Sequence, residues 1–123
     1  MRPKSFFLFA ASALVVTAAF VASPAISQSK TVTYKEIKPI LDRSCINCHG
    51  AKKQQDGVRL DSYEAIVKSK QGKLFKAGKP AESDLLLYVN GKKKPQMPMM
   101  AKPLPANEIQ MISDWIAQGA KEK

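Results

Sequence analysis

Both cysteines of the 123-residue chain and its only histidine lie in one short stretch, SCINCHG, at residues 44–50. Cys45 and Cys48 are three residues apart, and His49 follows directly. Three chemistries use a C-x-x-C pair outside a structural disulfide: a redox-active dithiol, a zinc site, and covalent attachment of haem. The added histidine favours haem, because two thiols at this spacing can each form a thioether with a vinyl group while the adjacent imidazole binds the iron.

The other uses of the motif fit the chain less well. A structural zinc ion needs four ligands, and Cys45, Cys48 and His49 are only three. A thioredoxin-like pair stands at a helix N-terminus in a βαβ unit, where its thiol pKa is lowered, whereas this motif closes a predicted helix. An exported dithiol oxidoreductase is the enzyme alternative, and an ordinary disulfide beside a hydrogen-bonded histidine is the structural one.

The second axial ligand of such an iron cannot be another histidine of the same chain, so a thioether sulfur is the natural choice. Besides Met1, the chain has Met97, Met99, Met100 and Met111. Met97 is preferred, because it precedes Pro98 in a proline-stiffened loop that can hold a weak ligand at little ordering cost. Met111 lies on a predicted helix, where we expect it to pack in the core. We expect Met99 and Met100 to fill gaps in the packing or to lie on the apolar surface. An iron with no sixth ligand would make the chain a gas-binding module.

The N-terminus has the order of a secretory signal: Arg2 and Lys4, an apolar stretch over residues 6–22, and then SPAISQ. We expect cleavage after Ser27, which makes residues 1–27 a signal peptide and residues 28–123 one small domain in the periplasm. The apolar stretch is nearly long enough to span a bilayer, so an uncleaved anchor is the alternative. No membrane span is expected after cleavage.

The chain is basic, with 20 Lys and Arg against 10 Asp and Glu. Loss of Arg2 and Lys4 leaves 18 basic residues against 10 acidic ones, a formal net charge of +8. Nucleic acid is not the expected partner, because the lysines are scattered without interleaved aromatic residues to stack bases. Acidic-surfaced redox proteins are the expected partners, steered by basic residues such as Lys52, Lys53 and Lys92 to Lys94.

Helical spacing of apolar residues dominates the mature chain, and no segment alternates long enough to predict a strand. The first helix is predicted to begin after Thr33, which forms a capping box with Glu36. Pro39 removes a backbone donor, so it must kink this helix or start a second one. The apolar positions of the helix are Tyr34, Ile37, Ile40 and Leu41. The cysteine motif follows at its C-terminal end.

Three more helices are predicted after the motif. Asp61 and Glu64 form a second capping pair, before a short helix with Ile66 and Val67 on one face. The third helix follows Pro80 and runs through LLLYV to Asn90 and Gly91. The last extends from about Pro105 to Gly119, with one apolar stripe made of Ile109, Ile112, Trp115 and Ile116. The predicted fold class is all-α, in one domain.

These segments resemble a class I c-type cytochrome over nearly the whole mature chain, and in particular the small single-haem domains of planctomycete-like bacteria. The resemblance rests on YKEIKPILDRSCINCHG, DGVRLDSYEAIV, GKPAESDLLLYV, QMPMM and LPANEIQMISDWIAQGA. It implies a cytochrome c-like fold whose N- and C-terminal helices cross around one covalently bound haem c. Cys45 and Cys48 would form the thioethers, with His49 as the proximal and Met97 as the distal iron ligand.

The resemblance implies electron transport by an iron that cycles between Fe(II) and Fe(III). The chain has no second histidine and no evident acid–base pair, so no enzyme activity is expected. It lacks the Gly-Pro pair that orients the histidine in mitochondrial-type cytochromes, which leaves the partner of His49 Nδ1 unassigned. Arg59 is a candidate to neutralise a haem propionate, and a solvated arginine is the alternative.

Overall fold

The structure is a computed structural model, and it describes residues 30–123; the signal peptide predicted for residues 1–27 lies outside the described residues. The described part contains four α-helices and two 3-10 turns: α1 (Tyr34–Ser44), η1 (Gln55–Gly57), α2 (Tyr63–Gly72), η2 (Pro80–Glu82), α3 (Asp84–Val89) and α4 (Ala106–Ala117). Residues 30–123 contain no strand, only an isolated bridge between His49 and Gln54, so the all-α prediction is confirmed there. No helix in this range is both long and apolar enough to cross a membrane.

Helix α1 begins as its sequence predicts. The Thr33 backbone N–H donates to Glu36 Oε2 at 2.7 Å, which closes the capping box. Pro39 lies inside the helix without ending it, so α1 is one helix and not two. The predicted apolar face is buried in full: Tyr34, Ile37, Ile40 and Leu41.

Helix α2 corrects two details of the sequence reading. Ser62 is its N-cap, with Oγ accepting from the Ala65 N–H at 3.2 Å. Asp61 is bound instead to Arg59, with 2.6 Å between its Oδ1 and Arg59 Nε. Both residue types are good caps, and the ion pair takes Asp61 away from the helix end. Ile66 is fully buried as predicted, but Val67 turns to solvent and is 40% exposed.

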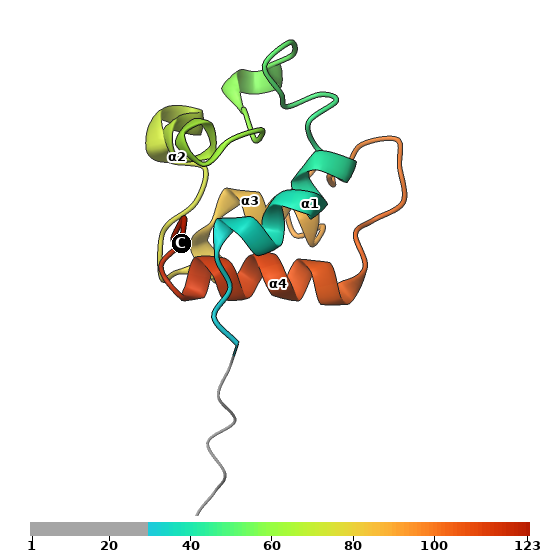
Figure 1. Cartoon of the computed structure of the whole chain (residues 1–123). Helices are drawn as coiled ribbons and strands as arrows, with labels where there is room; N and C mark the ends of the chain where they lie inside the picture. The colour runs from blue at the N-terminus through green and yellow to red at the C-terminus, as the bar shows by residue number, and fades with distance from the viewer. Residues whose placement is uncertain (1–29) are drawn as a thin grey trace, which may run out of the picture.

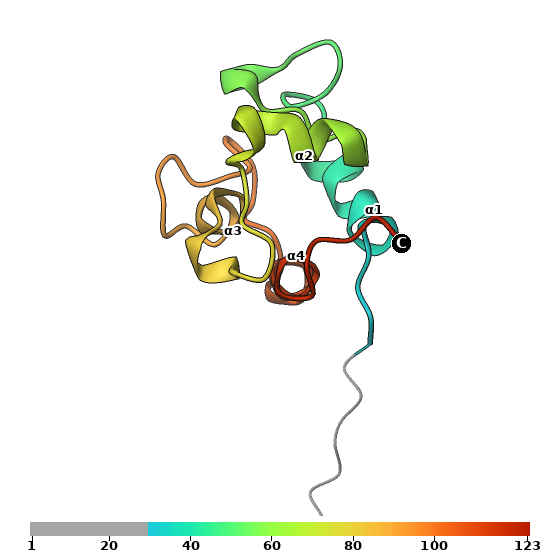
Figure 2. The ribbon, with the colours of Figure 1, turned by 90° about the vertical axis from the view of Figure 1, so that its left-hand side faces the viewer.

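Helices α1 and α4 pack across each other, as the resemblance implies (Figure 1). Figure 2 views α4 nearly end-on, with α1, α2 and α3 around a common centre. The fully buried aliphatic side chains of α1 and α4 are Ile37, Leu41, Ile112 and Ile116. An ion pair of 2.6 Å between Arg43 Nη2 and Glu108 Oε1 joins the end of α1 to the start of α4. Apolar packing and this ion pair thus join α1 and α4 into one unit, the α1–α4 pair.

Trp115 joins α4 to both ends of the domain. Its side chain is fully buried, and its Nε1–H donates to the Lys121 carbonyl at 2.8 Å. The same carbonyl accepts from the Tyr34 N–H at 2.9 Å, at the start of α1. The Phe75 ring lies 5.1 Å from the Trp115 ring, centroid to centroid. One aromatic side chain thus links α1, α4 and the α2–α3 connection.

Candidate functional site

Helix α1 ends at the cysteine motif, which folds into a compact turn. Cys45 is the C-cap, and its N–H donates to the Leu41 carbonyl at 2.8 Å. The Cys48 and His49 N–H groups then donate to the Cys45 carbonyl at 3.2 and 2.9 Å. Both thiols are free: Cys45 is partly buried against the core, and Cys48 is exposed. The turn therefore presents two thiols and an imidazole from one short, hydrogen-bonded segment.

The backbone of His49 is tied to the following loop, because its carbonyl accepts from the Leu60 N–H at 2.7 Å. The imidazole Nδ1 is buried and has no hydrogen-bond partner among the described residues. A buried polar atom left unpaired costs about 1–3 kcal/mol. The structural alternative of a histidine satisfied by hydrogen bonds therefore does not fit Nδ1, and the described residues supply no partner that would orient the ring through this atom.

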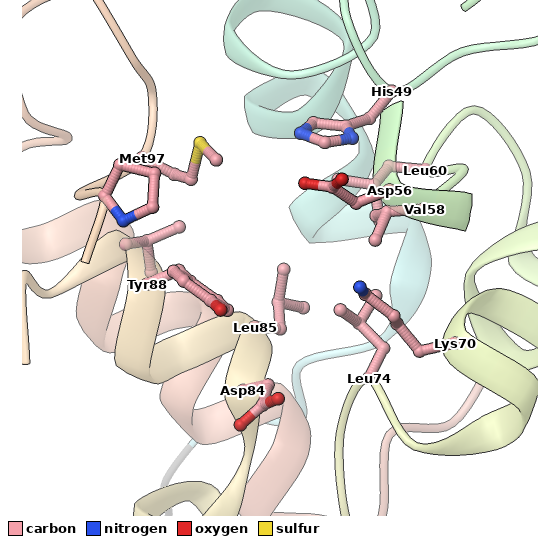
Figure 3. Close-up of a pocket in the computed structure, with 12 residues that line it drawn as sticks. His49, Asp56, Val58, Leu60, Lys70, Leu74, Asp84, Leu85, Tyr88 and Met97 are labelled. Carbon is pink, nitrogen blue, oxygen red and sulfur yellow. The ribbon is translucent and has the colours of Figure 1, made fainter. Parts of the chain in front are cut away.

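His49 lines an apolar cleft with an open space of about 630 Å³, part of it open to solvent (Figure 3). Pockets that hold cofactors are mostly apolar. Apolar residues supply most of its walls: Val58, Leu60, Leu74, Leu85, Val89, Pro95 and Met97. Of these, Leu60 and Val89 are 3% exposed, so the cleft is the open side of the core rather than a surface groove. Such an apolar lining suits a haem.

Met97 reaches the same cleft from the loop after α3. Its N–H donates to the Tyr88 carbonyl at 3.0 Å, which anchors this part of the loop to α3. Figure 3 shows its sulfur and the His49 ring facing one another across the cleft. Met99 and Met100 are 52% and 103% exposed, Met111 packs against the core, and none of the three lines the cleft. Geometry thus separates Met97 from the other methionines of residues 30–123.

Arg59 is not among the residues that line the cleft. Its guanidinium makes two hydrogen bonds to the Asp61 carboxylate, at 2.6 and 2.9 Å. This contact lowers the pKa of Asp61 and raises that of Arg59. The charge of Arg59 is therefore already paired, outside the cleft, and its assignment to a propionate stays a prediction.

Several cleft residues were not singled out by the sequence reading, among them Asp56, Lys70 and Tyr88. Asp56 and Lys70 both have left-handed backbones, with φ of +55° and +52°. The Asp-Gly pair at 56–57 is a recognisable turn signal. No sequence pattern predicts that this turn lies close to the end of α2, because that proximity depends on packing between separate segments.

Cys45 does not have the character of a reactive thiol. Burial raises the pKa of the Cys45 thiol to about 11. Dithiol oxidoreductases depend on a lowered thiol pKa, because the thiolate is the nucleophile. For the zinc alternative, residues 30–123 contain no group of three or more His, Cys, Asp or Glu side chains that could hold a metal ion.

Comparison with known proteins gives one match. Residues 45–99 match the model of a family described as Planctomycete cytochrome C. The matched segment starts at Cys45 and includes Cys48, His49 and Met97, and it leaves α1 and α4 outside. It supports a cytochrome c-like family and, with it, haem and electron transport. No curated protein and no solved structure matches the chain.

Proposed function

We propose that this chain is a periplasmic, single-haem class I cytochrome c that carries one electron between redox partners. One observation carries the proposal: the His49 ring and the Met97 sulfur face the same apolar cleft, and two free thiols lie in the turn beside it. The family match over residues 45–99 supports its coarser part, a c-type cytochrome electron carrier.

In this proposal each residue of the site has one role. Cys45 and Cys48 would hold haem c through thioether bonds, and His49 and Met97 would be the metal-binding residues. The bound haem supplies a centre that takes up and gives back one electron. The aliphatic walls exclude water from that centre, and a thioether ligand in a low-dielectric site raises its reduction potential.

We infer no substrate chemistry beyond electron transfer. The only histidine of the chain is assigned to iron, which leaves no imidazole for general acid–base work. The gas-binding alternative needs an open sixth position, and the presence of Met97 on the same cleft as His49 counts against it. The raised pKa of Cys45 counts against the dithiol alternative.

A haem stain on a denaturing gel tests the proposal. The full chain, produced with haem-attachment machinery, should be recovered from the periplasm as a red protein that stays stained after denaturation, because only covalent haem survives it. The double variant Cys45→Ala/Cys48→Ala is the control and should lose the stain. A colourless protein whose Cys45 and Cys48 are joined in a disulfide would overturn the proposal.

We also propose that the partners are acidic-surfaced redox proteins. Lys52 and Lys53 are exposed on the loop after His49, and Lys92 and Lys94 are exposed on the loop that leads to Met97. Lys93 differs, because its Nζ binds Asp84 at 2.7 Å. The charges on these two loops lie on segments that contribute to the cleft, where an acidic partner would be steered toward the haem.

Oxidation by two small reagents of opposite charge checks this steering. Oxidation of the haem-loaded protein by anionic ferricyanide should slow as salt rises, because the Debye length falls from about 30 Å at 0.01 M to about 8 Å at 0.15 M. Oxidation by cationic tris(phenanthroline)cobalt(III), which is a strong enough oxidant for a high-potential haem, should not slow. Lys52→Gln and Lys92→Gln should each reduce the ferricyanide rate at low salt more than the control Lys35→Gln, an exposed lysine of α1. Equal salt dependence for both oxidants would contradict the idea.

A further inference from the structure

Lys70, in the last turn of α2, is the only lysine or arginine among the residues that line the cleft. We propose that Lys70 would bind a carboxylate of the group seated there, a haem propionate, in the role for which the sequence makes Arg59 a candidate. This inference rests on the proposed function. It concerns a residue that neither the cysteine motif nor the methionine loop identifies.

A buried serine sets the position of Lys70. Ser69 is 4% exposed, and its Oγ accepts from the Arg59 N–H at 2.8 Å and lies 2.9 Å from the Ala65 carbonyl. Ser69 itself is extended, with ψ of 140°, so the chain leaves the helical path at this residue. The backbone just before Lys70 is therefore held by the core and by the segment that carries Val58 and Leu60.

The backbone at Lys70 is strained. Lys70 and Gln71 have φ of +52° and +58°, and Gly72 follows with φ of +78°. The left-handed conformation costs a non-glycine residue roughly 1–2 kcal/mol. Such residues cluster at ligand clamps and active sites, where the surrounding structure over-determines them. Figure 3 shows the consequence: the Lys70 amino group points from the end of α2 into the cleft.

The charges around the cleft leave Lys70 without a partner of its own. Asp84 of α3 is bound to Lys93, and Asp56 of η1 lies across the cleft from α2 without forming an ion pair with Lys70 among the described residues. Apart from His49 and Tyr88, the other lining residues carry no titratable group. Lys70 is an exposed residue whose ammonium has no ion-pair partner among residues 30–123, and a bound haem would bring two carboxylates with which it could pair.

The proposed role of Lys70 is tested by the direction in which each substitution shifts the reduction potential of the haem-loaded protein. Lys70→Gln should lower the potential, because a nearby cation disfavours the oxidised state, which carries one more positive charge. Asp56→Asn should raise it, and asparagine tolerates the left-handed backbone as aspartate does. Lys70→Arg should keep the wild-type potential. Lys73→Gln, an exposed residue of the same helix end that does not line the cleft, is the matched control.

The pH dependence of the reduction potential is a second measurement. It would not change if Lys70 only supported the fold. Removing the Lys70 charge should shift the propionate protonation step to higher pH, because a cation stabilises the ionised carboxylate. The double variant Asp56→Asn/Lys70→Gln should show the same shift relative to Asp56→Asn alone. Haem attachment that fails in Lys70→Gln but not in Lys70→Arg supports the same role.

Two failures are distinguishable. If the wild-type protein carries no covalent haem, the proposed function and this inference both fall. If it does, and Lys70→Gln has the same potential and pH profile as Lys73→Gln, only the inference is overturned.

Discussion

Met97→Ala is expected to remove the sixth iron ligand and to lower the reduction potential. The Met97 sulfur is the only thioether of residues 30–123 that lines the cleft, and alanine cannot reach across it. Thioether sulfur favours Fe(II), and each tenfold loss of that preference lowers the potential by about 59 mV. The ferric absorption spectrum checks the ligand, since the sulfur-to-iron band near its red edge should disappear. Electrochemistry on the same sample checks the potential.

The neighbouring methionines supply matched controls for this prediction. Met99→Ala and Met100→Ala delete the same side chain from the same loop, at positions that are 52% and 103% exposed. Both should retain the wild-type spectrum and potential. If Met97→Ala were unchanged and Met100→Ala lost the band, the ligand would be Met100, and the loop would have to rearrange when haem binds.

Trp115→Ala should be the most destabilising single change in the core. It leaves a large cavity between α1 and α4 and removes the indole hydrogen bond to Lys121. Truncation of a buried tryptophan costs about 3–5 kcal/mol, which is a large share of the 5–15 kcal/mol that typically stabilises a folded domain. Urea unfolding of the haem-loaded protein, followed by far-UV circular dichroism, measures the loss.

Two variants separate the cavity from the hydrogen bond. Trp115→Phe keeps most of the ring and loses the indole N–H, and the Lys121 carbonyl keeps its bond from Tyr34. Its cost should be about 1 kcal/mol from the hydrogen bond, plus a smaller packing loss. Val67→Ala, on the exposed side of α2, should change stability by roughly 0.5 kcal/mol or less. Equal unfolding free energies for Trp115→Ala and Val67→Ala would mean that Trp115 does not support the core.

The local features of this protein follow from its sequence alone. The C-x-x-C-H motif specifies its chemistry within five residues, and the Thr33–Glu36 capping box starts α1 through contacts three residues apart. The apolar spacing of α1 and α4 predicts their buried faces, because a helix repeats every 3.6 residues. The choice between Asp61 and Ser62 as the N-cap of α2 was harder to predict. The ion pair of Asp61 with Arg59 leaves Ser62 as the cap.

Only the tertiary structure decided which distant residues share the cleft. It places Met97 rather than Met99 or Met100 opposite His49, 48 residues away along the chain. It also pairs Arg59 outside the cleft and turns Lys70 into it. These outcomes depend on how α2, α3 and two loops pack on the α1–α4 pair, where each side chain competes for contacts with residues far away in sequence. Periodicity and capping act over a few residues and carry no information about that competition.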